Sequence, residues 1–249
     1  MKIISWNVNG LRAVYKRNFL EWLSDSKADV VCLQEIKSDL ENIPKDLINP
    51  KGYFSFFNPA EKKGYSGTAV FSKQSPEKVE TKSGMKNFDS EGRFLKLEFS
   101  DFILIVLYLP HGGRGKEKMK YKLACYEFLQ NYMKKLKDKN VLLIGDFNIA
   151  REGIDLARPK ENNNNTMFTP EERGALNKLL ALGFEDTFRK FHKEGENYTW
   201  WPYFANARER NLGWRIDYAF AKGISPKSAA ILKDVKGSDH CPIEVEISD

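Results

Sequence analysis

The sequence predicts an α/β protein, because stretches typical of buried strands alternate with stretches typical of amphipathic helices. Residues 30–33 (VVCL) and 141–144 (VLLI) are short aliphatic runs, as in strands that are covered on both faces. Residues 11–22 and 119–136 instead place apolar side chains at helical spacing. A chain of 249 residues can bury a large core. We expect one domain, 1–249, since α/β chains of this length often form one.

The other elements follow from the same patterns. Strands are expected at residues 2–8, 28–35, 53–57, 67–72, 93–99, 102–109, 141–144 and 243–247, with 93–99 and 102–109 paired as a hairpin. Besides the two helices above, a third is expected at 170–182. Thr169 and Glu172 have the spacing of a capping box there, and Pro170 takes the first helical position.

Three of the expected strands deliver polar side chains where their apolar runs stop. Asn7 and Glu35 lie at the ends of the first two, and Asp146 and Asn148 follow the run at 141–144. In an extended backbone, residues two apart point the same way, so Asp146 and Asn148 should emerge together. If the strands are neighbours, the four side chains converge, and hard oxygen ligands favour Mg²⁺ or Mn²⁺ over zinc. Taken alone, Gly-Asp-x-Asn is more often a turn that merely caps a strand.

The net positive charge and an aromatic segment are compatible with binding of a polyanion such as a nucleic acid. The chain has 40 Lys and Arg against 34 Asp and Glu, a formal net charge of +6, although many proteins are this basic. Arg12 and the other basic residues of 11–22 are ordinarily solvated, but beside a phosphate site they could bind a nucleic-acid backbone. Residues 198–204 (YTWWPYF) usually indicate core. Beside the arginines at 208 and 210, they could instead accept an unstacked nucleotide or sugar.

The histidines and cysteines indicate a candidate catalytic residue and the compartment of the protein. A lone histidine is more often structural, but His240 follows Asp239 in a short polar turn and could meet Asp217, which would fix its tautomer. The three cysteines show no CxxC spacing, and no signal peptide or membrane-length apolar run is present. These features favour a cytoplasmic protein in a reducing compartment with no membrane partner.

Six segments together resemble the exonuclease III family of apurinic/apyrimidinic (AP) endonucleases, in the endonuclease/exonuclease/phosphatase superfamily. They are WNVNGLRA (6–13), LQEIK (33–37), GYSG (64–67), GDFN (145–148), GWRIDY (213–218) and GSDHCP (237–242). The likeness covers essentially the whole chain, in the same order. The first and fifth segments are specific to the DNA-repair branch, whereas Ser-Asp-His is shared more widely. The resemblance implies a four-layer α/β sandwich, with two mixed β-sheets packed face to face and flanked by helices.

The resemblance also implies an activity. The chain would be a Mg²⁺-dependent DNA repair endonuclease, with Mn²⁺ able to substitute, that hydrolyses the phosphodiester 5′ to an abasic site in duplex DNA. Side activities would be 3′–5′ exonuclease and 3′-phosphodiesterase or phosphatase. A monomer is expected, with other base excision repair proteins as further partners. The alternatives are the same chemistry on another lesion such as deoxyuridine, a lipid or inositol phosphate phosphodiesterase, and a DNA-binding module without activity.

Carried over motif by motif, the resemblance assigns roles to the residues at the strand ends. Glu35 would be the principal metal ligand, helped by Asn7 or Asp239, with Asp146 and Asn148 beside them. Asp146 would position or deprotonate the attacking water, and Asn148 would hold the scissile phosphate. His240, oriented by Asp217, would donate to a non-bridging oxygen as negative charge builds. Tyr108 would either contact the phosphate or activate the nucleophile.

The same likeness assigns DNA contacts. Arg114, Asn162 and Asn165 would lie near backbone phosphates and Tyr65 at the minor groove, while Trp200, Trp214 and Ile216 would surround the flipped abasic sugar. Phe204 would act as an intercalating wedge. The chain departs from vertebrate members at Asn9, which replaces an acid, and in the loop 111–114, which makes Arg114 the weaker match.

Overall fold

The computed structural model describes residues 1–248 and contains two six-stranded mixed sheets. The first sheet has the order β11-β12-β1-β2-β4-β3, in which β1 and β2 are parallel and the other pairs antiparallel. Its strands are β1 (Lys2–Asn7), β2 (Val30–Gln34), β3 (Phe54–Asn58), β4 (Thr68–Ser72), β11 (Pro226–Ile231) and β12 (Ile243–Ile247).

The second sheet repeats this plan, with the order β5-β6-β7-β8-β10-β9 and a parallel pair, β7 and β8, at its centre. Its strands are β5 (Lys78–Glu80), β6 (Phe94–Glu98), β7 (Ile103–Tyr108), β8 (Val141–Asp146), β9 (Glu185–Asp186) and β10 (Asp217–Lys222). The expected hairpin of residues 93–99 and 102–109 is present as β6 and β7.

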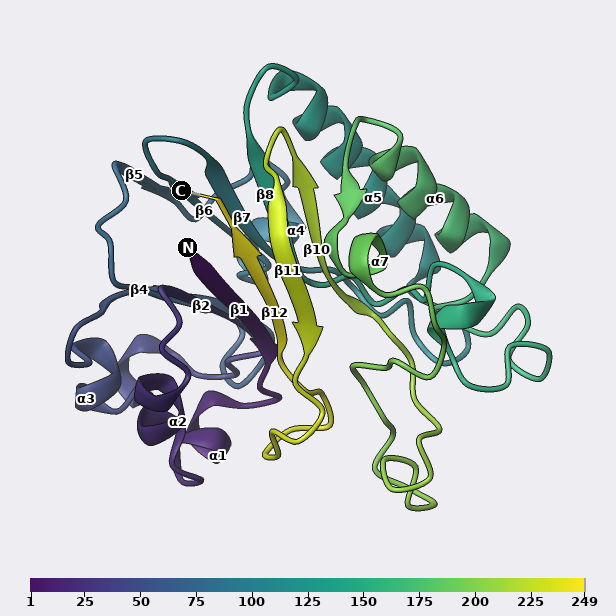
Figure 1. Ribbon diagram of the computed structural model, residues 1–249, viewed down its shortest axis with the longest axis horizontal. Helices are drawn as coiled ribbons and strands as arrows, with labels where there is room; N and C mark the ends of the chain where they lie inside the picture. Colours follow the sequence, from purple (N-terminus) through teal and green to yellow (C-terminus); the bar gives the residue numbers. More distant parts are fainter. Residues whose placement is uncertain (249) are drawn as a thin grey trace.

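Helices cover the outer faces of the two sheets, except for α7 (Thr187–Phe191), which lies against β11 of the first sheet and β10 of the second (Figure 1). They are α1 (Leu11–Tyr15), α2 (Phe19–Asp25), α3 (Lys45–Ile48), α4 (Lys86–Ser90), α5 (Met119–Lys135), α6 (Pro170–Leu180) and α7 (Thr187–Phe191), with 3₁₀ turns at Leu40–Asn42 and Gly153–Asp155. The expected single helix at 11–22 is therefore two helices. Asn18, between them, adopts a left-handed conformation with φ 63° that an α-helix cannot contain.

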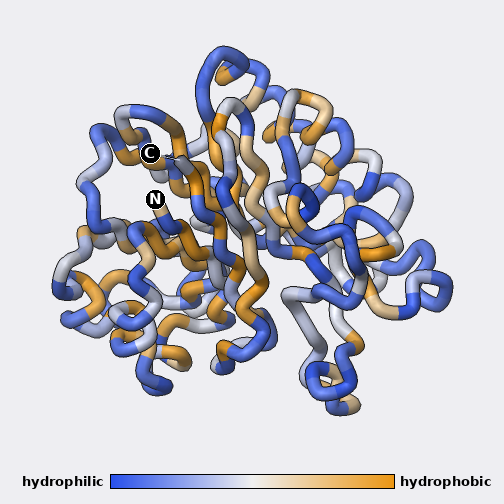
Figure 2. The backbone as a smooth tube through the Cα atoms, viewed as in Figure 1, coloured by the Kyte–Doolittle hydropathy of each residue, from blue (hydrophilic) through white to orange (hydrophobic). Residues whose placement is uncertain are grey.

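Side-chain alternation along the strands builds the layers. On β8, Leu142 and Ile144 pack into the core between the two sheets, whereas Leu143 faces the outer core beneath α5 and α6. On β1, Ile3 belongs to the inter-sheet core and Ile4 to the core beneath α1–α3. The tube in Figure 2 shows the apolar residues along these strands and the polar ones in the connections. The expected four-layer α/β sandwich is thus confirmed, and no helix within 1–248 is long and apolar enough to cross a membrane.

The topology brings the polar strand ends to one edge of the sandwich. Parallel β1 and β2 end side by side, with Asn7 opposite Gln34, and parallel β7 and β8 end with Tyr108 opposite Asp146. Antiparallel β10 begins at that same end, with Asp217 opposite Asp146. Gly145 allows β8 this close approach, because a Cβ there would lie 2.0 Å from the Leu107 carbonyl oxygen.

Candidate active site

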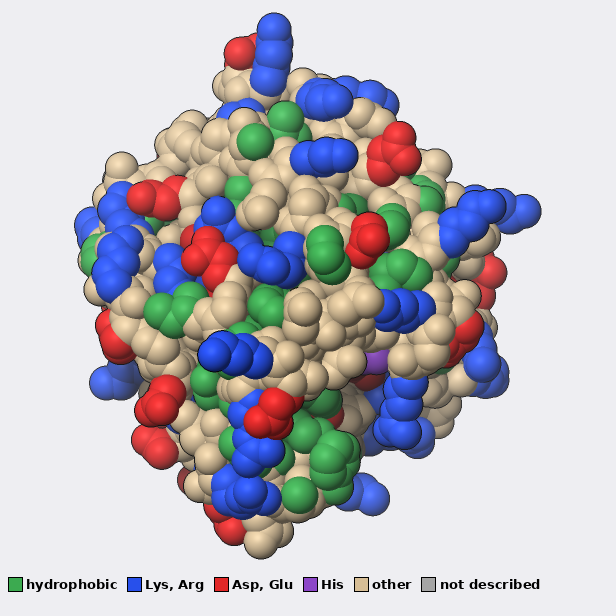
Figure 3. Space-filling view, turned by 90° about the vertical axis from the view of Figure 1, so that its right-hand side faces the viewer, with side chains coloured by type: hydrophobic (Ala, Val, Ile, Leu, Met, Phe, Trp, Pro, Cys, Tyr) green, Lys and Arg blue, Asp and Glu red, His purple; other side chains and the backbone are tan. Residues whose placement is uncertain are grey.

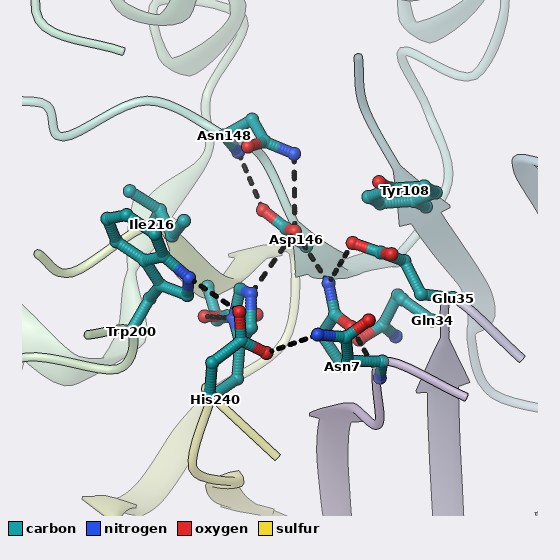
Figure 4. Close-up of polar contacts among 12 residues, drawn as sticks. Asn7, Gln34, Glu35, Tyr108, Asp146, Asn148, Trp200, Ile216 and His240 are labelled. Carbon is teal, nitrogen blue, oxygen red and sulfur yellow. Dashed lines mark hydrogen bonds and ion pairs between the residues drawn. The ribbon is translucent and has the colours of Figure 1, made fainter. Parts of the chain in front are cut away.

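Asp146 lies at the centre of the polar groups at this edge (Figure 4). It is 1% exposed. Its Oδ2 accepts hydrogen bonds from the Asn7 side-chain amide at 2.9 Å and the Asn148 side-chain amide at 3.2 Å. Burial and the charge of Asp217 raise its pKa, although His240 opposes the shift. This carboxylate therefore sits where excess negative charge favours the arrival of a proton or a cation.

Glu35 lies directly after β2 and is joined to Asp146 through Asn7. The Asn7 amide donates to Glu35 Oε1 at 3.0 Å, and the Lys37 ammonium pairs with Oε2 at 2.7 Å. Burial acts to raise the pKa of Glu35, but Lys37, Asn7 and a hydrogen bond from Tyr108 hold it below its usual value. Glu35 has φ 52°, and a non-glycine residue in this region stores about 1 kcal/mol or more of strain. The chain thus holds an ionised carboxylate in an unfavourable backbone conformation.

His240 and Asp217 form a buried pair beside Asp146. The structure brings them into contact as expected, with 2.8 Å between His240 Nδ1 and Asp217 Oδ2. His240 Nε2 points toward Asp146, 3.9 Å from its Oδ2. Burial alone would lower the pKa of His240, but Asp217 raises it above its usual value, through its charge and the hydrogen bond. The imidazole is therefore held as a cation that can donate from Nε2.

Asp239, the residue before this histidine, faces the other side of the site. Its Oδ2 accepts from the Trp200 indole at 3.0 Å and its Oδ1 from the Asn9 amide at 2.9 Å. Burial opposes ionisation, but His240 and these hydrogen bonds lower its pKa. Asn9 also accepts from Lys37, so hydrogen bonds connect Asp239 to the Glu35 side of the site.

Asn148 reaches the site by a route that differs from the expected one. The expectation that the Asp146 and Asn148 side chains emerge together is confirmed, since the Asn148 side-chain amide donates to Asp146 Oδ2 at 3.2 Å. The extended conformation on which it was based is wrong, because β8 ends at Asp146 and Asn148 is left-handed with φ 51°. The two side chains meet through a turn in which Asp146 Oδ1 accepts from the Asn148 backbone N–H at 2.8 Å. The Asn148 side-chain amide also donates to the Leu109 carbonyl at 2.9 Å. The turn that ends β8 therefore also places the Asn148 side chain in the site.

Two neighbouring groups of side chains could hold a divalent metal. Asp146, Asp217 and His240 have ligand atoms within 4.8 Å of one another. His240 fits this role less well, because hard divalent ions such as Mg²⁺ prefer oxygen ligands to an imidazole nitrogen. Glu35 and its neighbours fit better. The Glu35 carboxylate already attracts a cation, the Lys37 ammonium. Its ligand atoms are hard oxygens, which Mg²⁺ prefers.

An open cleft of about 890 Å³ adjoins this site, and Asp239 lines both. Several expected DNA contacts line it, namely Arg114, Asn162, Asn165, Trp200, Phe204 and Trp214. Tyr203, from the aromatic segment 198–204, Arg158 and Lys116 line it as well. Tyr203 and Phe204 are 76% and 70% exposed. Figure 3 shows basic side chains spread over one face of the molecule, with a hydrophobic group at its lower end. The cleft thus combines cationic and aromatic surfaces.

Three expected DNA contacts lie outside this cleft. Ile216 is 1% exposed and packs in a small core behind Trp200 and Trp214. Arg12 is exposed and lines a separate groove with Lys16, Arg17 and Lys37. Tyr65 is half-buried, and its hydroxyl accepts from the Arg93 guanidinium at 3.0 Å.

Sequence reasoning also missed residues that support the site. Arg93 donates to the Tyr108 carbonyl at 3.0 Å and lies over the Tyr108 ring, 4.4 Å from its centre. Arg93 lies at the start of an expected strand, and nothing in the sequence there predicts its contact with Tyr108. Lys37 did carry a signal, because it lies two residues after Glu35, in the segment 33–37.

Comparison with known proteins agrees with this geometry. The endonuclease/exonuclease/phosphatase family matches residues 4–240. The chain is 46% identical over 255 residues to an exodeoxyribonuclease of Bacillus subtilis, with all of both chains covered. It is similar to the structure of an AP endonuclease from Archaeoglobus fulgidus (31% identity, TM-score 0.89, 100% of both chains). It is also similar to a 3′ phosphatase from Neisseria bound to a product DNA hairpin (28% identity, TM-score 0.91, 100% of this chain and 99% of that chain). The chain therefore belongs to the endonuclease/exonuclease/phosphatase family and, within it, to the exonuclease III group of AP endonucleases.

Proposed function

We propose that this enzyme hydrolyses the phosphodiester 5′ to an abasic site in duplex DNA, with Mg²⁺ as the metal and Mn²⁺ able to replace it. The observation that carries the proposal is the buried Asp146, flanked by Asn7 and Glu35 on one side and by His240 on the other, beside a cationic and aromatic cleft. The family is metal-dependent. A divalent ion would supply a Lewis acid that neutralises phosphate charge.

We assign the residues at the strand ends the roles that the family resemblance implies. Glu35 would be the principal ligand of the ion, helped by Asn7 or Asp239, with Asp146 and Asn148 as further candidate ligands. Asp146 orients the attacking water and accepts its proton, because its pKa is shifted toward the range in which a general base works. Asn148 holds the scissile phosphate.

Two further groups act on the phosphate. His240, kept cationic by Asp217, donates from Nε2 to a non-bridging oxygen as charge builds there. Burial and the charge of Glu35 raise the pKa of Tyr108, so its hydroxyl stays protonated and contacts the phosphate as a donor rather than as a base. We therefore assign Tyr108 to phosphate contact rather than to activation of the nucleophile.

Cleavage of a defined duplex tests the function directly. A duplex with one tetrahydrofuran abasic analogue should be nicked on its 5′ side in Mg²⁺, and EDTA should stop the reaction until Mg²⁺ is restored. The same duplex without the analogue is the control. Failure to nick the analogue in either Mg²⁺ or Mn²⁺ would disprove the proposal.

The exposed aromatic pair at the cleft supplies a second prediction. Phe204→Ala should weaken binding to abasic duplex by about tenfold, because base–aromatic stacking contributes about 1–3 kcal/mol per ring. The matched control is Phe54→Ala, which removes a half-exposed ring on the edge strand β3. Fluorescence anisotropy at fixed salt measures both variants, since phosphate contacts make affinity salt-dependent. Equal affinity of the Phe204 variant and the wild type would exclude the wedge role.

We also propose 3′–5′ exonuclease and 3′-phosphatase side activities. The relative named as an exodeoxyribonuclease and the neighbour named as a 3′ phosphatase favour this extension. Both activities need the same hydrolysis of a phosphate ester, applied at a DNA end. A panel of lesions in one duplex, which includes a recessed 3′ end, a 3′ phosphate and deoxyuridine, would rank these activities against abasic cleavage.

A further inference from the structure

A fully buried ion pair lies directly behind the active site. Lys122 on α5 and Glu172 on α6 are both 0% exposed, and the Lys122 ammonium lies 2.5 Å from Glu172 Oε1. Burial lowers the pKa of Lys122, and Glu172 opposes the shift. Such pairs are a poor source of stability, because removing two charges from water costs about as much as their attraction returns. Their presence calls for another explanation.

The remaining hydrogens of the Lys122 ammonium point at the loops of the site. It donates to the Asn148 carbonyl at 2.6 Å and to the His111 carbonyl at 3.2 Å. A lysine has three donors, and all three are therefore used. Asn148 is left-handed, so this contact fixes the backbone of a residue whose conformation is intrinsically unfavourable.

Glu172 extends the connection to a third loop. Its Oε1 also accepts from the Met167 N–H and its Oε2 from the Thr169 N–H, both at 3.0 Å. Met167 and its neighbours in the loop 162–167 line the cleft, as does His111. The loops also contact each other, since the Thr166 hydroxyl donates to the Gly113 carbonyl at 2.7 Å.

We propose that Lys122 and Glu172 are positioning residues, which hold Asn148 and the cleft loops 111–116 and 162–167 in the one arrangement that fits a bound DNA backbone. The inference rests on the proposed function. Neither residue touches substrate, because both are enclosed. Their effect passes through the carbonyl of Asn148, whose side chain is expected to hold the scissile phosphate.

Lys122→Met removes the ammonium and keeps most of the side-chain volume. We expect kcat on the abasic duplex to fall by on the order of 10²-fold, because a displacement of about 1 Å at a reacting group can have this effect. The affinity for abasic duplex should change far less. The matched control is Lys96→Met, since Lys96 is also buried and pairs with Glu80 at 2.8 Å and Glu98 at 2.6 Å, on β6. Its kcat should equal that of the wild type.

Two further measurements separate positioning from simple folding. In Lys122→Met/Glu172→Gln the uncompensated buried charge is gone, so folding should recover while kcat stays low. Recovery of kcat in this double variant, or an unchanged kcat in Lys122→Met, would overturn the proposal. If the wild type itself does not cleave abasic DNA, the proposed function fails, and amide hydrogen exchange then decides about the pair. Exchange at 146–150 should accelerate in Lys122→Met but not in Lys96→Met, and equal exchange would overturn the positioning role.

Discussion

Asp146→Asn is expected to lower kcat for abasic-site cleavage by about 10²–10⁴-fold, the range attributed to a positioned general base. The amide has nearly the same shape, and its oxygen can still accept from the Asn148 N–H, as Asp146 Oδ1 does at 2.8 Å. Its nitrogen cannot accept from the Asn7 and Asn148 side-chain amides, as Oδ2 does. It cannot accept a proton from the attacking water. The affinity for abasic duplex should therefore persist, and single-turnover kinetics with anisotropy measures the two effects separately.

The control for this variant is Asp138→Asn, which changes an exposed acid near the end of α5. Thermal melting should show that both variants remain folded. A kcat for Asp146→Asn within about threefold of the wild type would remove Asp146 from the role of base.

His240→Asn should lower kcat by about 10²–10³-fold, because loss of one donor to a developing oxyanion has effects of this size. The variant also leaves the Asp217 carboxylate buried, at 2% exposure, without its partner. Breaking a buried ion pair destabilises a protein by about 3–5 kcal/mol. The kinetics must therefore be measured well below the melting temperature of the variant.

Two companion variants make the result interpretable. His240→Asn/Asp217→Asn should regain stability but not kcat, since the cationic donor is still missing. His192→Asn is the control, because His192 is half-exposed and its Nε2 contacts the Ala229 carbonyl, in a different part of the fold. Near-normal turnover in either His240 variant would show that this histidine does not stabilise the transition state.

The fold was largely predictable because hydrophobic periodicity and sheet topology determine it. The aliphatic runs of β2 and β8 predicted these two strands. Parallel pairing of β1 with β2 and of β7 with β8 then aligns the ends of the strands, where Asn7 and Asp146 lie. Short or edge elements such as β5 and β9 were not expected, because two or three residues carry no periodicity.

The candidate site was predictable in composition but not in detail. Glu35 and Asn148 adopt left-handed conformations, to which the alternation rule for strands does not apply. Contacts such as Lys122 to the Asn148 carbonyl join helices to loops and depend on tertiary packing alone. Sequence periodicity does not distinguish Lys122 from the other lysines of α5, although its ammonium is enclosed between α5 and α6.

The central claim is that separate strand ends converge to hold one divalent ion at Glu35. Anomalous diffraction from crystals soaked in Mn²⁺ tests it most directly. We expect a peak within coordination distance of a Glu35 carboxylate oxygen, at about 2.0–2.1 Å as for Mg²⁺-type sites, and no peak there in Glu35→Gln. A peak held instead by Asp146, Asp217 and His240, or no peak at this edge of the sandwich, would contradict it.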